Sequence, residues 1–85
     1  MRLIETSKFK KLRKKIKENR EKEALRQAVS KILESPDAGK QLKGEFKELR
    51  SLSYTTKGQN RRLIYRKDAG TIVLFSFGPR EGAYK

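Results

Sequence analysis

TIVLFSFG, residues Thr71 to Gly78, is the most apolar run of the chain. A strand with one solvated face alternates apolar and polar side chains, whereas a strand covered on both faces is apolar almost throughout. This run therefore predicts a β-strand near the centre of a sheet, with its aromatic residues in the core. The apolar side chains are those of Ile72, Val73, Leu74, Phe75 and Phe77.

Two further strands are predicted immediately before this run. FKELRSLSYTT (Phe46 to Thr56) and RRLIYRK (Arg61 to Lys67) are separated by the turn KGQN, and DAG separates the second strand from the apolar run. Turns at this spacing join antiparallel neighbours, so the three segments predict an antiparallel meander. A sheet this small needs cover on at least one face.

The first half of the chain supplies that cover. RLIE (residues 2–5) predicts a short first strand, and Thr6 or Ser7 caps a helix over 7–17 whose apolar stripe is Phe9, Leu12 and Ile16. Asn19 is placed to cap a second helix, which SPDAG (35–39) ends. Its apolar positions are Ala24, Leu25, Ala28, Val29, Ile32 and Leu33. The expected fold is one α+β domain over residues 1–85: a strand, an antiparallel two-helix hairpin, and the meander in a curved sheet.

The composition indicates a polyanionic partner. The chain has 85 residues, with Lys+Arg 23 against Asp+Glu 10, and a net charge of +13. Such a charge favours nucleic acid, with a membrane surface as the competing interpretation. No segment approaches the ~20 apolar residues of a spanning helix, and no signal peptide is apparent. We therefore expect a soluble cytoplasmic protein with no membrane association.

The missing residue types narrow the chemistry. The chain has no Cys and no His, which excludes disulfides, thiolate nucleophiles, histidine bases and most transition-metal sites. The acids are scattered singly among cations, so no metal and no cofactor are expected. Any catalysis must then use Lys, Arg, Tyr, Ser, Thr or an isolated carboxylate.

The first predicted helix is strongly basic, with no acid between Ser7 and Lys17. A run of charge on a helix is commonly a solvated face, and that alternative stands for each residue taken singly. Like charges at i, i+4 destabilise a helix, so the run as a whole favours a surface facing phosphates. The expected RNA contacts are Lys10, Lys11, Arg13, Lys14 and Lys15, together with Arg61 and Lys85.

The sheet face that the helices leave free can gather cations from several strands. Strands lie ~4.8 Å apart, so arginines on neighbouring strands can converge on one phosphodiester, whose oxygens a guanidinium binds bidentately. The candidates are Lys47, Arg50, Arg61 or Arg62, and Arg80. Tyr84 follows closely, and nearby cations would lower its pKa enough for it to act as a base. Alternatively it stacks on a nucleobase or packs the end of the chain.

Five segments together resemble the RelE/ParE superfamily of toxins from type II toxin–antitoxin modules of bacteria and archaea. They are LKG (42–44), ELRS (48–51), RRLIYR (61–66), TIVLFSFG (71–78) and the closing PREGAYK (79–85). The resemblance covers essentially the whole chain, and it implies the fold expected above. RelE-like members are ribosome-dependent messenger RNA endoribonucleases, whereas ParE-like members poison DNA gyrase.

The resemblance also implies roles for individual residues. Arg62 matches the arginine that holds the scissile phosphate, Arg80 the arginine that stabilises the phosphorane, and Tyr84 the C-terminal base or base-stacking tyrosine. Because the KGQN hairpin is longer than usual, the basic positions of the first meander strand could fall on Ser51 and Ser53. Lys47 and Arg50 are the substitutes that we consider for catalysis.

Three hypotheses follow from these observations. The first is a metal-independent endoribonuclease that cleaves messenger RNA in the ribosomal A site, through attack of the ribose 2′-hydroxyl on the adjacent phosphate. Its partners would be the ribosome, messenger RNA, ribosomal RNA bound by the basic first helix, and a cognate antitoxin. The second is a gyrase poison without RNA chemistry, and the third is a non-catalytic RNA-binding or ribosome-binding protein.

Overall fold

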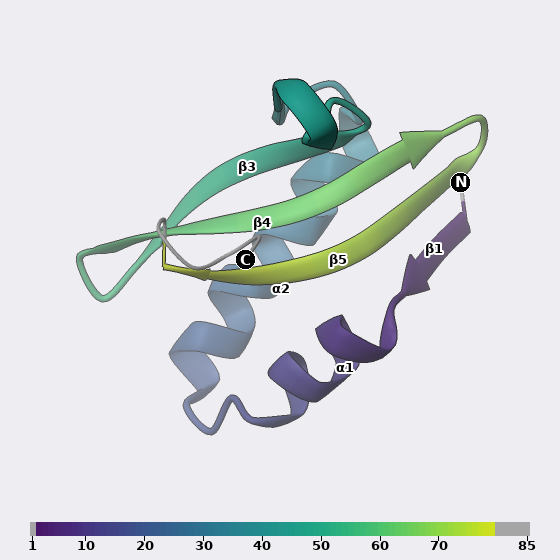
Figure 1. Cartoon of the computed structure of the whole chain (residues 1–85). Helices are drawn as coiled ribbons and strands as arrows, with labels where there is room; N and C mark the ends of the chain where they lie inside the picture. The colour runs from purple at the N-terminus through teal and green to yellow at the C-terminus, as the bar shows by residue number, and fades with distance from the viewer. Residues whose placement is uncertain (1, 80–85) are drawn as a thin grey trace.

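The computed structural model describes residues 2–79 and contains a single five-stranded sheet in the order β1-β5-β4-β3-β2 (Figure 1). The strands are β1 (Arg2–Glu5), β2 (Lys40–Gln41), β3 (Leu49–Thr56), β4 (Gln59–Asp68) and β5 (Thr71–Pro79). The helices are α1 (Ser7–Lys14), α2 (Asn19–Glu34) and a short 3₁₀ helix, η1 (Gly44–Phe46). The fold is α+β, as the sequence predicts.

The meander is confirmed, and β5 lies inside the sheet. β3, β4 and β5 pair antiparallel, while β1 pairs parallel with β5 from Arg2 opposite Thr71 to Glu5 opposite Leu74. β5 therefore has a neighbour on each edge, which explains its nearly continuous apolar sequence. β2 and η1 were not predicted, and β3 begins at Leu49 rather than at Phe46, which closes η1.

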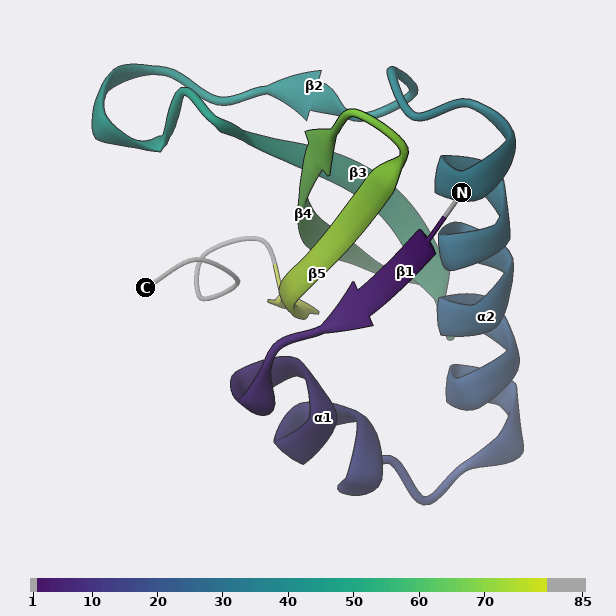
Figure 2. The same cartoon turned by 90° about the vertical axis from the view of Figure 1, so that its right-hand side faces the viewer.

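Both helices pack on one face of the sheet, and the segment between β2 and β3 projects away from α2 (Figure 2). Thr6 caps α1, because its hydroxyl accepts a hydrogen bond of 3.2 Å from the Phe9 amide. α1 ends at Lys14, three residues earlier than predicted. The cap position of α2 is Glu18, so the expected cap at Asn19 is wrong. Within residues 2–79, no helix is long and apolar enough to cross a bilayer.

The core lies between the helices and the sheet. Phe9 of α1 meets Phe77 of β5 edge to face, with 5.2 Å between ring centroids. Such aromatic pairs add about 0.5–1.5 kcal/mol beyond the area that they bury. The remaining buried members of the cluster are Leu25, Ala28, Ile32, Leu52, Leu63, Tyr65, Ile72 and Leu74.

A β-bulge in β5 interrupts the alternation of its side chains. Ile64 pairs with Ser76 but Tyr65 pairs with Leu74, so Phe75 is the extra residue. Leu74 and Phe77 consequently both face the helices, although they are three positions apart. Phe75 is only half-buried and lies outside this core, so its predicted core position is wrong.

Candidate functional site

Adjacent arginines on β4 point to opposite faces of the sheet. Arg61 pairs with Tyr54 on the helix-covered face, and its Nη2 lies 3.4 Å from Oε1 of Glu21 in α2. Arg62 pairs with Ser53 on one side and Gly78 on the other, on the face without helices. Within residues 2–79, no hydrogen bond or ion pair engages the Arg62 side chain. Arg61 therefore does not share the face of Arg62, and its RNA contact stays a prediction, whereas Arg62 occupies the predicted face.

Serines are paired with Arg62 and with Ile64, the next residue of β4 on the helix-free face. Ser53 lies directly across from Arg62, and Ser51 and Ser76 flank Ile64. Ser51 is 6% exposed, and its Oγ has no hydrogen-bond partner in the described chain. This Oγ is itself buried, so it carries the cost of a hydroxyl without a partner and is not open to a ligand at the surface.

The same face carries an arginine stacked on an aromatic ring. The guanidinium carbon of Arg66 lies 5.7 Å from the centroid of Phe75. Asp68, two residues along, accepts a 3.1 Å hydrogen bond from Nε of Arg66. Sequence reasoning missed this pair because only the bulge brings Phe75 to the face that Arg66 occupies.

The lysines of α1 are exposed, but Arg13 is already engaged. Lys10, Lys11, Lys14 and Lys15 all lie in solvent, as a phosphate-facing helix requires. Arg13 makes a bidentate ion pair with Glu5 of β1, at 2.6 Å from Nε to Oε2 and 3.2 Å from Nη2 to Oε1. Its guanidinium is thereby held by a carboxylate.

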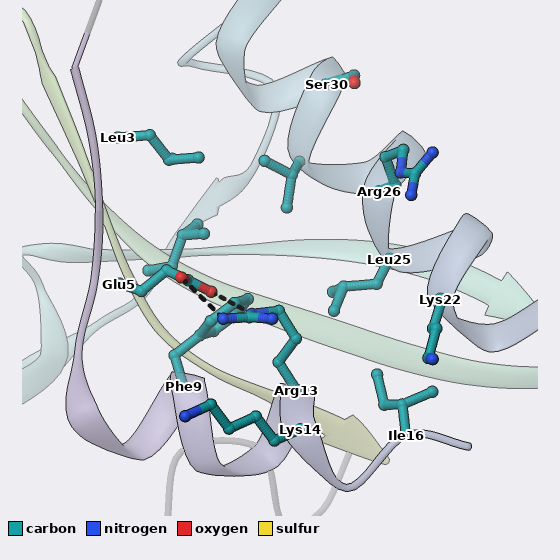
Figure 3. Close-up of a pocket in the computed structure, with 12 residues that line it drawn as sticks. Leu3, Glu5, Phe9, Arg13, Lys14, Ile16, Lys22, Leu25, Arg26 and Ser30 are labelled. Carbon is teal, nitrogen blue, oxygen red and sulfur yellow. Dashed lines mark hydrogen bonds and ion pairs between the residues drawn. The ribbon is translucent and has the colours of Figure 1, made fainter. Parts of the chain in front are cut away.

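A cleft of about 510 Å³ separates β1 and α1 from α2 (Figure 3). Apolar side chains form its floor, and Leu3 of β1 is 43% exposed there. Among residues 2–79, the one acid that lines it is Glu5, the partner of Arg13. The other lining residues are apolar Phe9, Ile16, Leu25, Val29 and Leu74, basic Lys14, Lys22 and Arg26, and Ser30.

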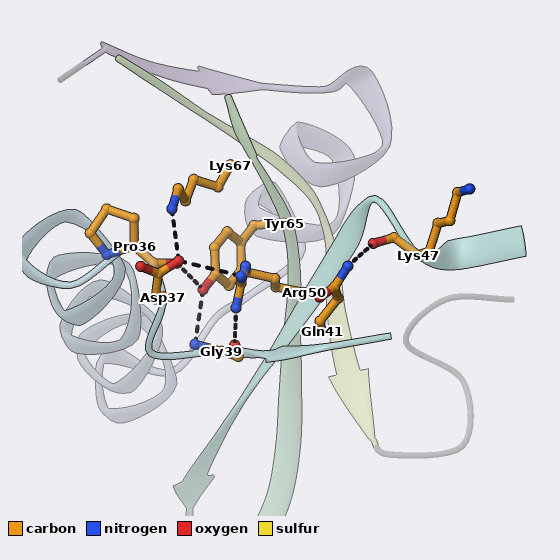
Figure 4. Close-up of polar contacts among 8 residues, drawn as sticks. All are labelled: Pro36, Asp37, Gly39, Gln41, Lys47, Arg50, Tyr65 and Lys67. Carbon is orange, nitrogen blue, oxygen red and sulfur yellow. Dashed lines mark hydrogen bonds and ion pairs between the residues drawn. The ribbon is translucent and has the colours of Figure 1, made fainter. Parts of the chain in front are cut away.

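Arg50 lies on the helix-covered face and not beside Arg62. It pairs with Tyr65, its Nη1 donates a 2.9 Å hydrogen bond to the carbonyl of Gly39, and its Nη2 lies 3.3 Å from Asp37 (Figure 4). Lys67 lies 2.7 Å from the same Asp37 carboxylate. The expectation that Arg50 joins Arg62 at a phosphate is wrong. The residue of β3 paired with Arg62 is Ser53, and Arg50, three positions before it, points to the opposite face.

Lys47 is not on a strand. It is the C-cap residue of η1, and its backbone carbonyl accepts a 2.9 Å hydrogen bond from Nε2 of Gln41 (Figure 4). Its exposed side chain therefore does not share the strand geometry of Arg62. The other predicted site residues, Arg80, Tyr84 and Lys85, lie outside the described residues.

The two tyrosines of the sheet are not bases. Burial raises the pKa of Tyr54 to about 12, and Arg61 opposes that effect only in part. Burial also raises the pKa of Tyr65, against the opposing effects of its Gly39 hydrogen bond and of Arg50. Both phenols remain protonated at neutral pH.

Comparison with known proteins identifies relatives of this fold. A family model described as "ParE-like toxin of type II bacterial toxin-antitoxin system" matches residues 3–85. The toxin–antitoxin complex RelBE of E. coli contains a similar chain, with a TM-score of 0.72 and 18% sequence identity. That similarity covers 92% of this chain and 94% of the other, and it concerns the fold. A search of curated proteins gave no significant match.

Proposed function

The chain belongs to the ParE-like toxins of type II bacterial toxin–antitoxin systems, and within that family we propose that it is a ribosome-dependent messenger RNA endoribonuclease. The proposed reaction is attack of a ribose 2′-hydroxyl on the adjacent phosphorus, with departure of the 5′-oxygen. It leaves a 2′,3′-cyclic phosphate and a 5′-hydroxyl, and needs no metal. The observation that carries the proposal is the position of Arg62 on the helix-free face, where no hydrogen bond or ion pair engages its side chain within residues 2–79.

Arg62 suits the scissile phosphate for physical reasons. A guanidinium keeps its charge at any physiological pH and presents paired N–H donors to phosphate oxygens. Its pairing partners on the two neighbouring strands are the small residues Ser53 and Gly78. Charge that develops on the phosphorane would be stabilised there, a contribution worth several kcal/mol in enzyme sites.

Two residues of the closing segment complete the proposed reaction. Arg80 would stabilise the phosphorane and protonate the leaving oxygen. Tyr84 would accept the 2′-hydroxyl proton or stack on a base. The exposed lysines of α1 would bind ribosomal RNA, and the ribosome would supply the bent substrate geometry that a site with a weak base requires.

A gyrase poison is the second candidate, and one feature of β3 favours it. The strand places Ser51 and Ser53 on the face of Arg62 and turns Arg50 away from it. Among residues 2–79, Arg62 is then the one cation of the β3–β4 hairpin that is placed to bind a phosphate near Ser53. An RNase benefits from several cations at its phosphate, whereas a gyrase poison needs none there.

One experiment separates these functions. The chain is expressed from a tightly controlled promoter, and new 5′ ends are mapped on translated messages. We expect codon-phased cleavage that is lost in Arg62→Gln and Arg80→Ala, reduced in Tyr84→Phe, and retained in Arg61→Gln, the neighbour on the opposite face. Intact messages with trapped gyrase–DNA complexes would establish the second candidate. If messages stay intact and no gyrase–DNA complex is trapped, only the RNA-binding hypothesis remains.

We also propose that the partner is an antitoxin, and that an acidic amphipathic helix of it occupies the cleft between β1, α1 and α2. The apolar floor suits side chains of a protein, and the cationic rim suits carboxylates. A second copy of this chain, which also has a net charge of +13, would bring its cations against the cationic rim of the cleft, so an acidic partner fits better.

The antitoxin proposal is tested with charge reversal on α2. Lys22→Glu and Arg26→Glu should weaken the complex with the co-expressed antitoxin at least tenfold. Lys31→Glu, on the same helix but outside the cleft, is the matched control. Equal weakening by all three variants would refute the cleft as the docking site.

A further inference from the structure

From the stacked pair of Arg66 and Phe75, we infer a second RNA contact: a platform on which one nucleobase of single-stranded RNA stacks, beside the phosphate bound at Arg62. The inference rests on the proposed function, because it names how that substrate is positioned. Nucleobases stack on aromatic rings and on guanidinium planes, and each such base contributes binding without requiring one sequence.

The bulge in β5 is the structural reason that Phe75 is available. Strict alternation would send residues 75 and 77 to the same face, where Phe77 packs in the core. The extra residue instead places Phe75 on the helix-free face, where it is only half-buried. Bulges commonly redirect a side chain beside a functional site.

Asp68 fixes the orientation of Arg66. The Nε–Oδ2 hydrogen bond of 3.1 Å ties the guanidinium toward the end of β4, while the side chain stays 38% exposed. A hollow of about 350 Å³, lined by Glu48, Arg66, Lys67 and Asp68, gives a base room beside the guanidinium. An exposed ion pair of this kind adds little to stability, so its effect is mainly geometric.

The spacing along β4 suits a single strand of RNA. Arg62 and Arg66 are four residues apart and share a face, which separates their Cα atoms by roughly 13 Å. Arg66 is drawn away from Arg62 by Asp68, so the two guanidiniums do not hold one phosphate. A strand following β4 would place its backbone at Arg62 and a neighbouring base on Arg66 and Phe75.

Binding without cleavage tests the platform. The probe is a fluorescently labelled pentanucleotide RNA with one 2′-deoxy sugar that blocks cleavage, paired with a copy that lacks the base expected to stack. Affinities are measured by anisotropy for the full chain and for Phe75→Leu, which keeps an apolar side chain, and Arg66→Lys, which keeps the charge. Lys31→Gln controls for the loss of one surface cation, and circular dichroism confirms folding.

We expect Phe75→Leu and Arg66→Lys each to weaken binding of the intact probe about fivefold to a hundredfold. With the abasic probe, both variants should bind like the unmodified chain, and Arg66→Lys should keep its salt dependence. Unchanged affinity in folded Phe75→Leu, or equal losses with both probes, would overturn the platform. Failure of the proposed function is seen separately, as messages left uncut by the unmodified toxin.

Discussion

The hydroxyl oxygen of Tyr65 lies 2.9 Å from the amide nitrogen of Gly39 and 2.6 Å from the carbonyl oxygen of Pro36. One phenol thus joins β4 to the segment that follows α2. It accepts a hydrogen bond from the Gly39 amide and donates one to the Pro36 carbonyl, so a single side chain satisfies two backbone groups of this segment.

Removing that hydroxyl should destabilise the fold. Tyr65→Phe leaves the ring in place but removes the hydrogen-bond partner of the Gly39 amide and of the Pro36 carbonyl. This loss should lower the free energy of unfolding by about 1–3 kcal/mol. Urea denaturation measures the change. Tyr54→Phe is the matched control, because no hydrogen bond joins the Tyr54 hydroxyl to another residue in 2–79. Equal losses in the two variants would contradict the assignment.

A methyl group at position 39 should also be destabilising. A Cβ added to Gly39 would lie 2.7 Å from both Cε1 and Oη of Tyr65, closer than side chains approach. Gly39→Ala should therefore cost about 1–3 kcal/mol of unfolding free energy. Because the two positions touch, Gly39→Ala combined with Tyr65→Phe should cost less than the sum of the single changes. Strict additivity would show that the ring moves aside freely.

Acid should weaken the fold through Asp37. The hydrogen bond and charge of Lys67, followed by the charge of Arg50, hold the pKa of this carboxyl below its ordinary value of 3.8. A carboxyl with a lowered pKa in the folded state stabilises it above the unfolded pKa, and this contribution disappears as the pH falls through the folded pKa. Asp37→Asn should be less stable than the unmodified chain at pH 7, and the difference should vanish at pH 2 in urea titrations.

Alkali should act through Tyr54. Burial raises its pKa to about 12 from 10.0, so the folded state holds the proton longer than the unfolded state does. Its stabilising contribution is complete below pH 10 and is lost between about pH 10 and pH 12. Because burial raises the pKa of Tyr65 as well, phenolate absorbance should show two tyrosines that titrate late, and Tyr54→Phe should reduce the amplitude of the late step by one phenolate. An unchanged amplitude in the variant would contradict the assignment to Tyr54.

A cation added beside Arg62 should strengthen RNA binding. Ser53 is exposed and lies directly across from Arg62 on the helix-free face, so Ser53→Lys adds a second charge there. Binding of a single-stranded RNA should tighten, and its slope against log salt should steepen by about 0.7. Thr55→Lys is the control on the same strand face, two pairs beyond Ser53 and across from Asn60. A steeper slope in the control alone would place the RNA elsewhere.

The strand pattern and the turns made most of the fold predictable. Period-two and continuous apolar segments identify β4 and β5, and the stripe through Phe9 and Leu12 identifies α1. The site was less predictable because it depends on side-chain direction. Arg61 and Arg62 are equivalent in a sequence, and only the pairing with Tyr54 and Ser53 assigns each to a face.

The bulge at Phe75 had no sequence signal, since an aromatic residue suits either face of a strand. Arg50 was misplaced for a related reason. Its strand begins at Leu49 rather than at Phe46, and nothing in FKELRS distinguishes a short 3₁₀ turn from the start of a strand. The faces of β3 follow from its pairing with β4, which is a long-range property.

The hydroxyl of Thr6 lies 2.9 Å from the carbonyl oxygen of Leu74, and β1 pairs along its whole length with β5. β1 has no pairing partner until residues 71–74 of β5 have been synthesised, because the paired residues lie 69 positions apart. While the helices and the strands β2 to β4 are being synthesised, β1 therefore lacks its neighbour, so the five-stranded sheet can close only after β5 has been made.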